Sequence, residues 1–270
     1  MPRNTLYEDP VVYDILHGPG TTAEVRGLMR IQRRFVGEVA RPVWLEPACG
    51  TGRYLRAAKR LGVCAIGFDL SASMIEHAKA RLAEVDGPRE NLFVADMRAF
   101  ARAGRVAAAS VHLVFCPINT IRHLASDRAM LAHLAEVRRV LVPGGVYAVG
   151  LSLSAPGMEF PSEDVWEGGR GACRVKQVVQ FVPPTRSGDR WEQAYSHLVV
   201  TRGERVEHRD ASYRLRCYTQ RQWLGLVQRA GLIVRATTDD AGRDVTPGPC
   251  GYAVYVLGCG SAQRKAVGQV

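Results

Sequence analysis

A short stretch that combines a carboxylate with two closely spaced glycines is the first place where this sequence could do chemistry. It reads Leu45-Glu46-Pro47-Ala48-Cys49-Gly50-Thr51-Gly52. Glycine is costly inside a helix or strand, so two glycines at this spacing mark a turn or a close approach of the backbone to a ligand. Such a turn suits a nucleotide phosphate, a dinucleotide or a cofactor without phosphate.

The residues around the second glycine argue against the first two ligands. A P-loop carries lysine directly after its last glycine, where this chain has Arg53. A dinucleotide loop needs a third glycine, but leucine or arginine stands there whether the spacing is counted from Gly50 or from Ala48. A cofactor without phosphate is therefore the ligand that this turn still allows. Gly50 and Gly52 would let the backbone approach an amino-acid moiety, and Glu46 would lie near its ammonium.

Short apolar runs alternate with amphipathic stretches from residue 43 onward. Runs with the composition of buried parallel strands lie at 43–47, 64–69, 91–96, 111–116 and 145–151. Stretches with apolar residues at helical spacing lie at 51–61, 71–85 and 127–141, two of them beginning with capping residues, Ser71 or Ser73 and Asp127. The alternation predicts an α/β fold with a doubly wound, mostly parallel, Rossmann-like sheet.

The pattern changes in the second half of the chain. Residues 173–216 alternate polar and apolar side chains without helical stretches, which predicts an antiparallel β insertion after the fifth strand. A helix at 219–230 and strands at 232–238 and 251–259 would complete seven strands, and an amphipathic helix is expected at 22–39. The predicted parts are an N-terminal helical cap (1–42), a cofactor-binding core (43–152), the insertion as a lid (153–217), the closing helix and strands (218–260) and a flexible tail (261–270).

Four motifs in register resemble the class I S-adenosylmethionine-dependent methyltransferases of small-molecule type. They are the glycine stretch (46–52), GFDLSASM (67–74), ADM (95–97) and RVLVPGG (139–145). The resemblance is strong over residues 43–151 and looser over the two closing strands. It implies S-adenosylmethionine as the cofactor, and four motifs in the family's order are far more specific than one.

The resemblance also implies a role for individual residues. Asp69 would accept hydrogen bonds from both ribose hydroxyls, a charged type of bond that contributes about 1.5–3 kcal/mol. Asp96 would accept from the adenine amino group, with the amide of Met97 at the ring edge. Leu70 and Met74 would cover the adenine or ribose, or pack in the core. The contacts with the methionine end would come from Glu46, Ala48, Gly50, Gly52 and Cys116.

The acceptor of the methyl group should lie beyond the fourth strand, where Asn119 and His123 follow. The activated methyl needs mainly a positioned nucleophile, although a hydroxyl acceptor often needs a general base. His123 is the candidate catalytic base, unless it is a structural histidine, and Asn119 either binds substrate or closes a turn. The stretch lacks the (D/N)PP(Y/F) pattern of similar enzymes that methylate amide or base nitrogens.

The N-terminal segment and the insertion supply further pocket candidates by resemblance to small-molecule members of the family. The N-terminal candidates are Tyr7, Tyr13 and His17. Tyr13 would contact the cofactor's amino-acid end or face the sulfonium through a cation–π contact of about 0.5–2 kcal/mol, or it anchors a helix. The insertion resembles the lid of N-methyltransferases acting on sugars or amino acids. Its roof would be lined by Trp166, Arg214 and Tyr218, unless these are ordinary sheet residues.

Composition leaves several partners open. The chain of 270 residues has a formal net charge of +10, yet its basic residues are dispersed, with one helical face carrying Arg26, Arg30, Arg33 and Arg34. No secretory signal, membrane-length apolar run or CxxC pair occurs, so a cytoplasmic protein without metal or membrane contact is expected.

We predict methylation of a nitrogen or oxygen on a small molecule. The alternatives are an RNA or protein methyltransferase that uses the positive charge to hold its partner, and a non-catalytic S-adenosylmethionine-binding subunit. A homodimer is compatible with the sequence.

Overall fold

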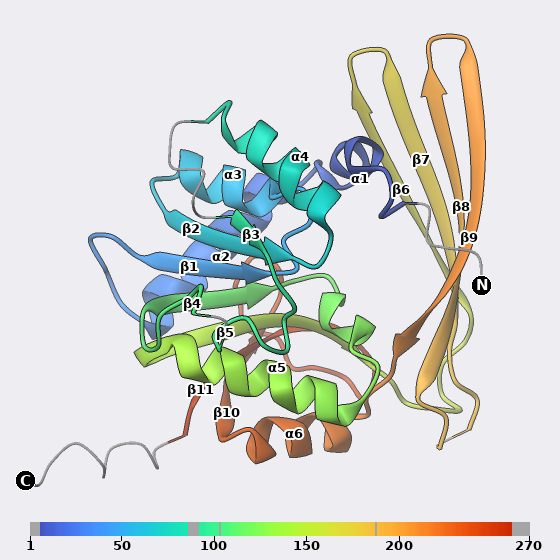
Figure 1. Cartoon of the computed structure of the whole chain (residues 1–270). Coiled ribbons are helices and arrows are strands. Elements are labelled where there is room, and N and C mark those ends of the chain that lie inside the picture. Colours follow the sequence, from blue (N-terminus) through green and yellow to red (C-terminus); the bar gives the residue numbers. More distant parts are fainter. Residues whose placement is uncertain (1–5, 86–91, 103, 187, 261–270) are drawn as a thin grey trace, which may run out of the picture.

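The protein is described by a computed structural model that covers residues 6–85, 92–102, 104–186 and 188–260. Its centre is a seven-stranded sheet in the order β10-β11-β5-β4-β1-β2-β3 (Figure 1). The strands are β1 (Val43–Pro47), β2 (Cys64–Asp69), β3 (Leu92–Val94), β4 (Val111–Cys116), β5 (Leu141–Leu153), β10 (Leu232–Thr238) and β11 (Gly251–Cys259). Only β11 runs in the direction opposite to the other six strands, which confirms the predicted mostly parallel sheet.

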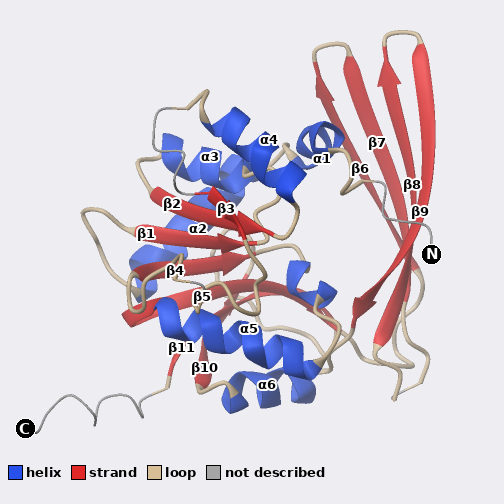
Figure 2. Ribbon diagram, viewed as in Figure 1, coloured by secondary structure: helices blue, strands red, loops and turns tan. Residues whose placement is uncertain are grey.

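Helices cover both faces of this sheet (Figure 2). One face carries α2 (Thr21–Phe35), α3 (Arg53–Arg60) and α4 (Ala72–Leu82), and the other carries α5 (Asp127–Val140) and α6 (Gln220–Arg229). Leu28 and Ile75 belong to the same buried cluster as Trp44 of β1. Leu134 and Trp223 belong to a second cluster, together with Val114 of β4. The core therefore has two layers, one on each side of the sheet.

The helices α4 and α6 begin with side-chain caps. Ser71 caps α4 by accepting from the backbone of Met74, and Thr219 forms a capping box at α6. The helix α5 differs from the prediction, because Ser126 is its N-cap and Asp127 is its first residue. The helix predicted at 22–39 ends at Phe35, since Gly37 adopts a left-handed φ of 92°.

The proline–glycine–glycine motif at 143–145 lies inside a strand, whereas the sequence predicts a helix up to residue 141 and the next strand only from residue 145. The strand β5 pairs with β4 at Leu141 and again from Val146. The residues between them form a bulge, in which Gly144 has a φ of 84°. Proline cannot donate to the ladder and glycine permits this φ, so the motif interrupts the pairing without ending the strand.

The insertion forms a separate four-stranded antiparallel sheet, which we call the lid. Its strands are β6 (Ser162–Arg170), β7 (Cys173–Val182), β8 (Trp191–Arg202) and β9 (Arg205–Arg216). The sequence predicted the last three strands but missed β6, whose Gly168-Gly169 pair is typical of a turn. Glycine is required at 168 for another reason: a Cβ there would lie 2.1 Å from the carbonyl oxygen of Ile15.

The short helix α1 (Pro10–His17) lies between the lid and the core (Figure 1). Val12, Ile15 and Leu16 of this helix share a buried cluster with Val175 and Leu198 of the lid. The predicted tail at 261–270 lies outside the described residues. None of the helices in the described ranges has the length and apolar character needed to span a membrane.

Candidate active site

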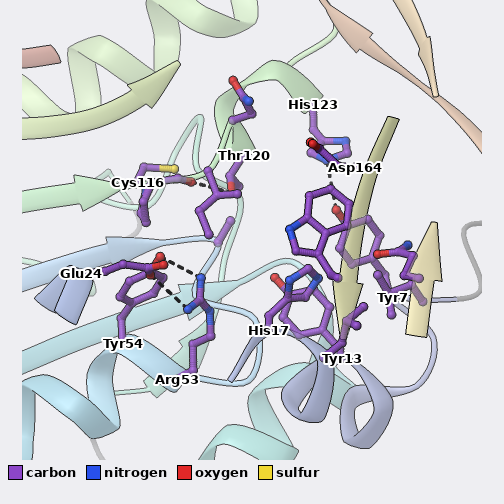
Figure 3. A pocket seen from close by; sticks show the side chains of 18 of the residues that line it. Tyr7, Tyr13, His17, Glu24, Arg53, Tyr54, Cys116, Thr120, His123 and Asp164 are labelled. Atoms are coloured by element: carbon purple, nitrogen blue, oxygen red, sulfur yellow. Dashed lines mark hydrogen bonds and ion pairs between the residues drawn. The ribbon is translucent and has the colours of Figure 1, made fainter. Parts of the chain in front are cut away.

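The carboxyl ends of the parallel strands meet at the edge of the sheet that faces the lid. Glu46 stands at the end of β1, Asp69 at the end of β2 and Cys116 at the end of β4, and Asp96 follows β3. Beyond β1 and β4 lies a cavity of about 550 Å³, walled by the core, the N-terminal segment and the lid (Figure 3). This is where open α/β sheets bind their ligands.

The glycine loop follows β1 in a chain of left-handed turns. Ala48, Gly50 and Gly52 have φ values of 54°, 51° and 68°. A side chain at Gly50 would press on the ring of Tyr13, with its Cβ 3.3 Å from Cε1. At Gly52, the first residue before α3, a Cβ would lie 3.2 Å from that of Ala78 in α4. Left-handed alanine costs about 1–3 kcal/mol and is typical of a ligand-binding turn.

Glu46 is a buried carboxylate with one oxygen that has no hydrogen-bond partner among the described residues. The residue is 4% exposed, lines the cavity, and its Oε2 is the orphaned atom. Burial raises the pKa of Glu46 well above its usual range, against the opposing charge of Arg53. An ammonium group placed at Oε2 would satisfy both the hydrogen bond and the charge. This orphaned oxygen fits the amino-acid end of S-adenosylmethionine.

Asp69 is held rigidly at the end of β2. One oxygen accepts from the amide of Gly50 at 2.9 Å and the other from the amide of Ser71 at 2.8 Å. Each oxygen keeps a second lone pair, so the carboxylate retains the capacity to accept from two ribose hydroxyls. The next residue, Leu70, is 73% exposed and free to cover a ligand, whereas Met74 is 2% exposed and is packed in the interior.

Asp69→Ala is expected to weaken S-adenosylmethionine binding tenfold or more, about 1.4 kcal/mol. The reason is that the variant loses the predicted ribose contacts and also frees the amide of Gly50 in the glycine loop. Isothermal calorimetry measures the change, and Ser73→Ala is a control at an exposed neighbouring position. A dissociation constant equal to that of the wild type would refute the ribose assignment.

Asp96 and Met97 are placed by neighbours that the sequence did not reveal. Asp96 accepts from Nε of Arg98 with both oxygens at 2.9 Å, and this interaction lowers its pKa. The carbonyl of Met97 lies 3.1 Å from Nδ1 of the fully buried His133. A carbonyl only accepts, so Nδ1 carries the proton and Nε2 accepts from the hydroxyl of Tyr147 at 2.8 Å. The adenine contacts of Asp96 and Met97 stay predictions.

Buried His133 should make stability depend on pH. Burial lowers its pKa to about 4, below the value of about 6.5 expected in the unfolded chain. Between these values the unfolded state binds a proton that the folded state does not. The free energy of unfolding should therefore fall with decreasing pH, by about 1.4 kcal/mol per unit from this group. Urea denaturation at pH 7 and pH 5 should show a smaller pH dependence in His133→Gln. Equal dependences would contradict the assignment.

A row of rings lines the cavity, running from β6 of the lid through the N-terminal segment and residue 123 to β9 of the lid. In order it consists of Trp166, His17, Tyr13, Tyr7, His123 and Tyr213, which we call the aromatic wall. Successive ring centroids are 6.2, 4.6, 5.7, 5.8 and 6.1 Å apart. The structure thus brings together five predicted pocket residues and adds Tyr213. Ring faces attract cations, so this surface suits a positively charged group.

His123 faces the cavity from the 3-10 helix η2 (Thr120–His123). Its Nε2 lies 3.3 Å from the hydroxyl of Tyr7, and Figure 3 shows both side chains above Tyr13 and His17. Desolvation in the cavity, and then the charge of Arg122, lowers the pKa of His123 below its usual value. The imidazole is therefore neutral at neutral pH and able to accept a proton.

Two predicted roof residues do not lie in the cavity. Side chains alternate along β9, so Tyr213 and Leu215 face the cavity while Arg214 is exposed on the outer surface, over the ring of Trp191. Tyr218 follows β9 and is fully buried in the core against Trp223. An apolar and aromatic stretch does not reveal which alternate residues face inward until the register of the strand is known.

Asn119 lines the cavity but its amide closes a turn. Its Nδ2 donates to the hydroxyl of Ser152 at 2.8 Å, and its Oδ1 accepts from the amide of Ser152 at 2.6 Å. The residue has a φ of 62°, which asparagine tolerates better than most residues. These bonds position η2 against β5. The structure thus favours the turn over the substrate contact that the sequence also allowed.

The cavity is acidic although the chain as a whole is basic. Its described lining includes one arginine, Arg53, and the carboxylates of Glu24, Glu46, Asp164, Glu167 and Asp240. Arg53 is engaged by Glu24 at 3.2 Å and by the hydroxyl of Tyr54 at 2.7 Å. Asp164 makes no ion pair with the described residues. Such a lining favours a cationic ligand over an anionic one.

Two of the four arginines on α2 contact another segment of the chain. Arg30 donates to the carbonyl of Ala241 at 2.6 Å, and Arg34 pairs with Asp244 at the same distance. Both contacts join α2 to the segment after β10, which gives these arginines a structural use. Within the described ranges, no group of three or more histidine, cysteine or acidic side chains is placed to hold a metal ion.

The comparisons with known proteins find methyltransferases. Residues 45–145 match a family model described as a methyltransferase domain. A dTDP-3-amino-3,6-dideoxy-alpha-D-glucopyranose N,N-dimethyltransferase from Streptomyces fradiae is 28% identical over 230 residues, which cover 83% of each chain. The dTDP-3-amino-3,4,6-trideoxy-alpha-D-glucopyranose N,N-dimethyltransferase from Streptomyces venezuelae is 27% identical over 91% of this chain and 95% of its own length.

A solved structure shows the same architecture. The crystal structure of DesVI from Streptomyces venezuelae superimposes with a TM-score of 0.68 at 25% identity, over 90% of this chain and 94% of that one. S-adenosylmethionine fits the glycine loop, the orphaned Glu46 oxygen and the seven-stranded sheet. The chain is a class I S-adenosylmethionine-dependent methyltransferase.

Proposed function

We propose that the enzyme methylates the amino group of a small molecule, with an amino sugar as the leading acceptor class. The observation that carries this proposal is the cavity itself, in which the aromatic wall and unpaired Asp164 suit a cationic amine. The curated relatives described above are named as amino-sugar N,N-dimethyltransferases and align over most of their length, which supports a nitrogen acceptor.

The chain's own side chains would then share three tasks. Bound S-adenosylmethionine supplies a methyl group that is already activated by its sulfonium sulfur. Glu46 would hold the ammonium of the cofactor, and Tyr13, above the glycine loop, would cover the same end. Asp164 would attract the acceptor as its ammonium. Neutral His123 would take the proton from that nitrogen, which frees the lone pair that attacks the methyl carbon.

An anionic polymer is the less favoured acceptor. The carboxylates in the cavity would repel phosphates, and the only arginine among the described lining residues is already paired. An RNA methyltransferase would instead need cations that follow the backbone into the site. The same argument suggests that any phosphate of an activated sugar stays outside the enclosed part of the cavity.

The test is a turnover assay with a matched panel of acceptors. Purified enzyme and S-adenosylmethionine are incubated with amino sugars, free and nucleotide-linked, with the corresponding hydroxy sugars, and with RNA. Mass spectrometry should find one or two added methyl groups on the amino sugars, located at nitrogen by fragmentation. Methylation confined to the hydroxy sugars or to RNA would refute the proposal.

A further inference from the structure

A buried amide, paired with a buried hydroxyl, lies among apolar side chains on the inner face of the lid. The buried side chains around it on β7 and β8 are Val175, Val179, Ala194, Leu198 and Val200. Among them Gln177 is 2% exposed and lines the cavity. Burying an amide costs free energy unless its polar atoms find hydrogen-bond partners, so the partners of this side chain decide what it can do.

Gln177 is held at one end only. Its Nε2 donates to the hydroxyl of Ser196 at 2.7 Å, and Ser196 is itself 6% exposed on β8. Within the described part of the chain this is the only hydrogen bond of the Gln177 side chain. The bond fixes the orientation of the amide and leaves its carbonyl oxygen as an acceptor. A hydrogen-bond acceptor that is held in one orientation and faces a cavity is preorganised to bind a donor group of a ligand.

The surroundings of Gln177 indicate what that partner is. Trp166 lies directly opposite Gln177 in the pairing of β6 with β7, and it also lines the cavity together with Phe181. An aromatic plate beside a fixed acceptor suits a ring with an apolar face and hydroxyl groups on its edge. In the proposed function, Asp164 and His123 bind and deprotonate the amino group of the acceptor. The oxygen of Gln177 is therefore available to a different substituent.

We infer that Gln177 is a specificity-determining residue that accepts a hydrogen bond from a hydroxyl group of the acceptor. The inference rests on the proposed function, because it concerns the same cavity and the same amine. It adds a requirement that the proposed function does not contain: the acceptor carries a hydroxyl donor at a fixed position relative to the methylated nitrogen. Ser196 is the positioning residue that keeps the amide turned towards this hydroxyl.

The experiment compares an amino sugar with its mono-deoxy analogues, each lacking one hydroxyl. In the wild type, removal of one particular hydroxyl should lower kcat/KM at least tenfold, since it leaves the Gln177 oxygen unpaired. In Gln177→Leu the same removal should change kcat/KM less than threefold. Ser196→Ala should give an intermediate ratio. Binding of S-adenosylmethionine, measured by calorimetry, should be unchanged in all variants.

Matched variants distinguish the loss of this hydrogen bond from a general disturbance of the lid's structure. Gln180→Leu makes the same substitution on the exposed face of β7 and should keep the wild-type ratio. Gln177→Met, which preserves an unbranched side chain, replaces Gln177→Leu if the latter does not fold. A wild-type ratio in a folded Gln177 variant overturns the inference while the proposed function stands. If the wild type methylates no amine in the panel, the proposed function fails and the inference fails with it.

Discussion

Replacing Asp14 with asparagine is expected to lower the free energy of unfolding by about 3–5 kcal/mol, the usual cost of breaking a buried ion pair. Asp14 is fully buried in α1 and pairs with Arg56 of α3, whose side chain is 8% exposed. Asparagine keeps the shape but removes the charge, so the guanidinium of Arg56 would stay buried without compensation. Urea denaturation followed by circular dichroism measures the effect.

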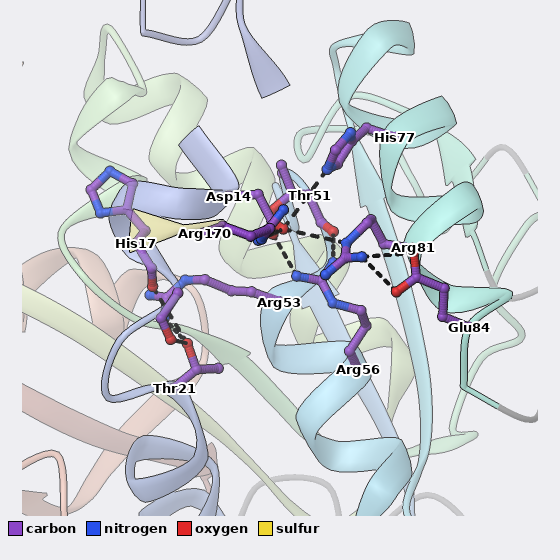
Figure 4. Close-up of polar contacts among 12 residues, drawn as sticks. Asp14, His17, Thr21, Thr51, Arg53, Arg56, His77, Arg81, Glu84 and Arg170 are labelled. Atoms are coloured by element: carbon purple, nitrogen blue, oxygen red, sulfur yellow. Dashed lines mark hydrogen bonds and ion pairs between the residues drawn. The ribbon is translucent and has the colours of Figure 1, made fainter. Parts of the chain in front are cut away.

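The effect should be large because Asp14 joins several parts of the molecule (Figure 4). Its carboxylate accepts from the hydroxyl of Thr51 in the glycine loop at 2.8 Å and from Arg170 at the end of β6 at 2.6 Å. Arg81 of α4 lies 3.5 Å away. One carboxylate thus ties α1, the cofactor loop, the core helices and the lid together.

The contribution of Asp14 should persist into strong acid. Burial by itself raises the pKa of this carboxyl, but Arg56, Arg170 and Thr51 outweigh burial and lower the pKa to about 2. The unfolded value is about 3.9. The stabilisation is therefore complete above about pH 4 and is lost as the pH falls through about 2.

Two variants distinguish this cluster from ordinary surface charge. Glu76→Gln removes one member of an exposed pair with Lys79 and should cost less than about 1 kcal/mol. The double variant Asp14→Asn/Arg56→Gln should lose less than the sum of its single variants, because neither charge then remains uncompensated. An Asp14→Asn protein with the denaturation midpoint of the wild type would show that Asp14 does not hold these parts together.

His123→Ala is expected to lower kcat for amine methylation by about 10²–10⁴-fold, the range that a positioned general base supplies. Binding of S-adenosylmethionine should be unchanged, because the role proposed for this cavity-lining ring concerns the acceptor and not the cofactor. Tyr7→Phe should give a smaller loss, since it removes only the hydroxyl 3.3 Å from Nε2. Single-turnover assays with an amino sugar measure both effects.

The pH profile separates a base from a residue that only fills space. The lowered pKa keeps His123 neutral, and hence active, to a pH below its ordinary value of about 6.5. The acid limb of kcat/KM should therefore lie below pH 6.5 and disappear in His123→Ala. As a control, His208→Ala removes an exposed histidine of the lid and should leave the profile intact. Unchanged turnover in His123→Ala would remove this residue from the mechanism.

The sequence by itself located the proposed cofactor site, because the residues assigned to it are close along the chain. Glu46, Gly50 and Gly52 belong to one turn, and Asp69 ends the next strand, where the parallel arrangement of βαβ units places it beside the first. Helical and strand periodicity likewise located most elements of the core. These features follow from local geometry and from burial patterns that any single segment displays.

Only the tertiary structure shows which residues of the N-terminal segment and the lid line the cavity. The sequence around Gly168 is typical of a turn, and only the packing of α1 on β6 shows why glycine is needed there. Arg214 was predicted to line the pocket, and only the register of β9 shows that Tyr213 faces the cavity instead. Asp14 and Gln177 carry no local signal, since their partners lie on other elements. The reason is physical: a strand's register and the neighbours of a buried polar group are set by contacts between distant segments.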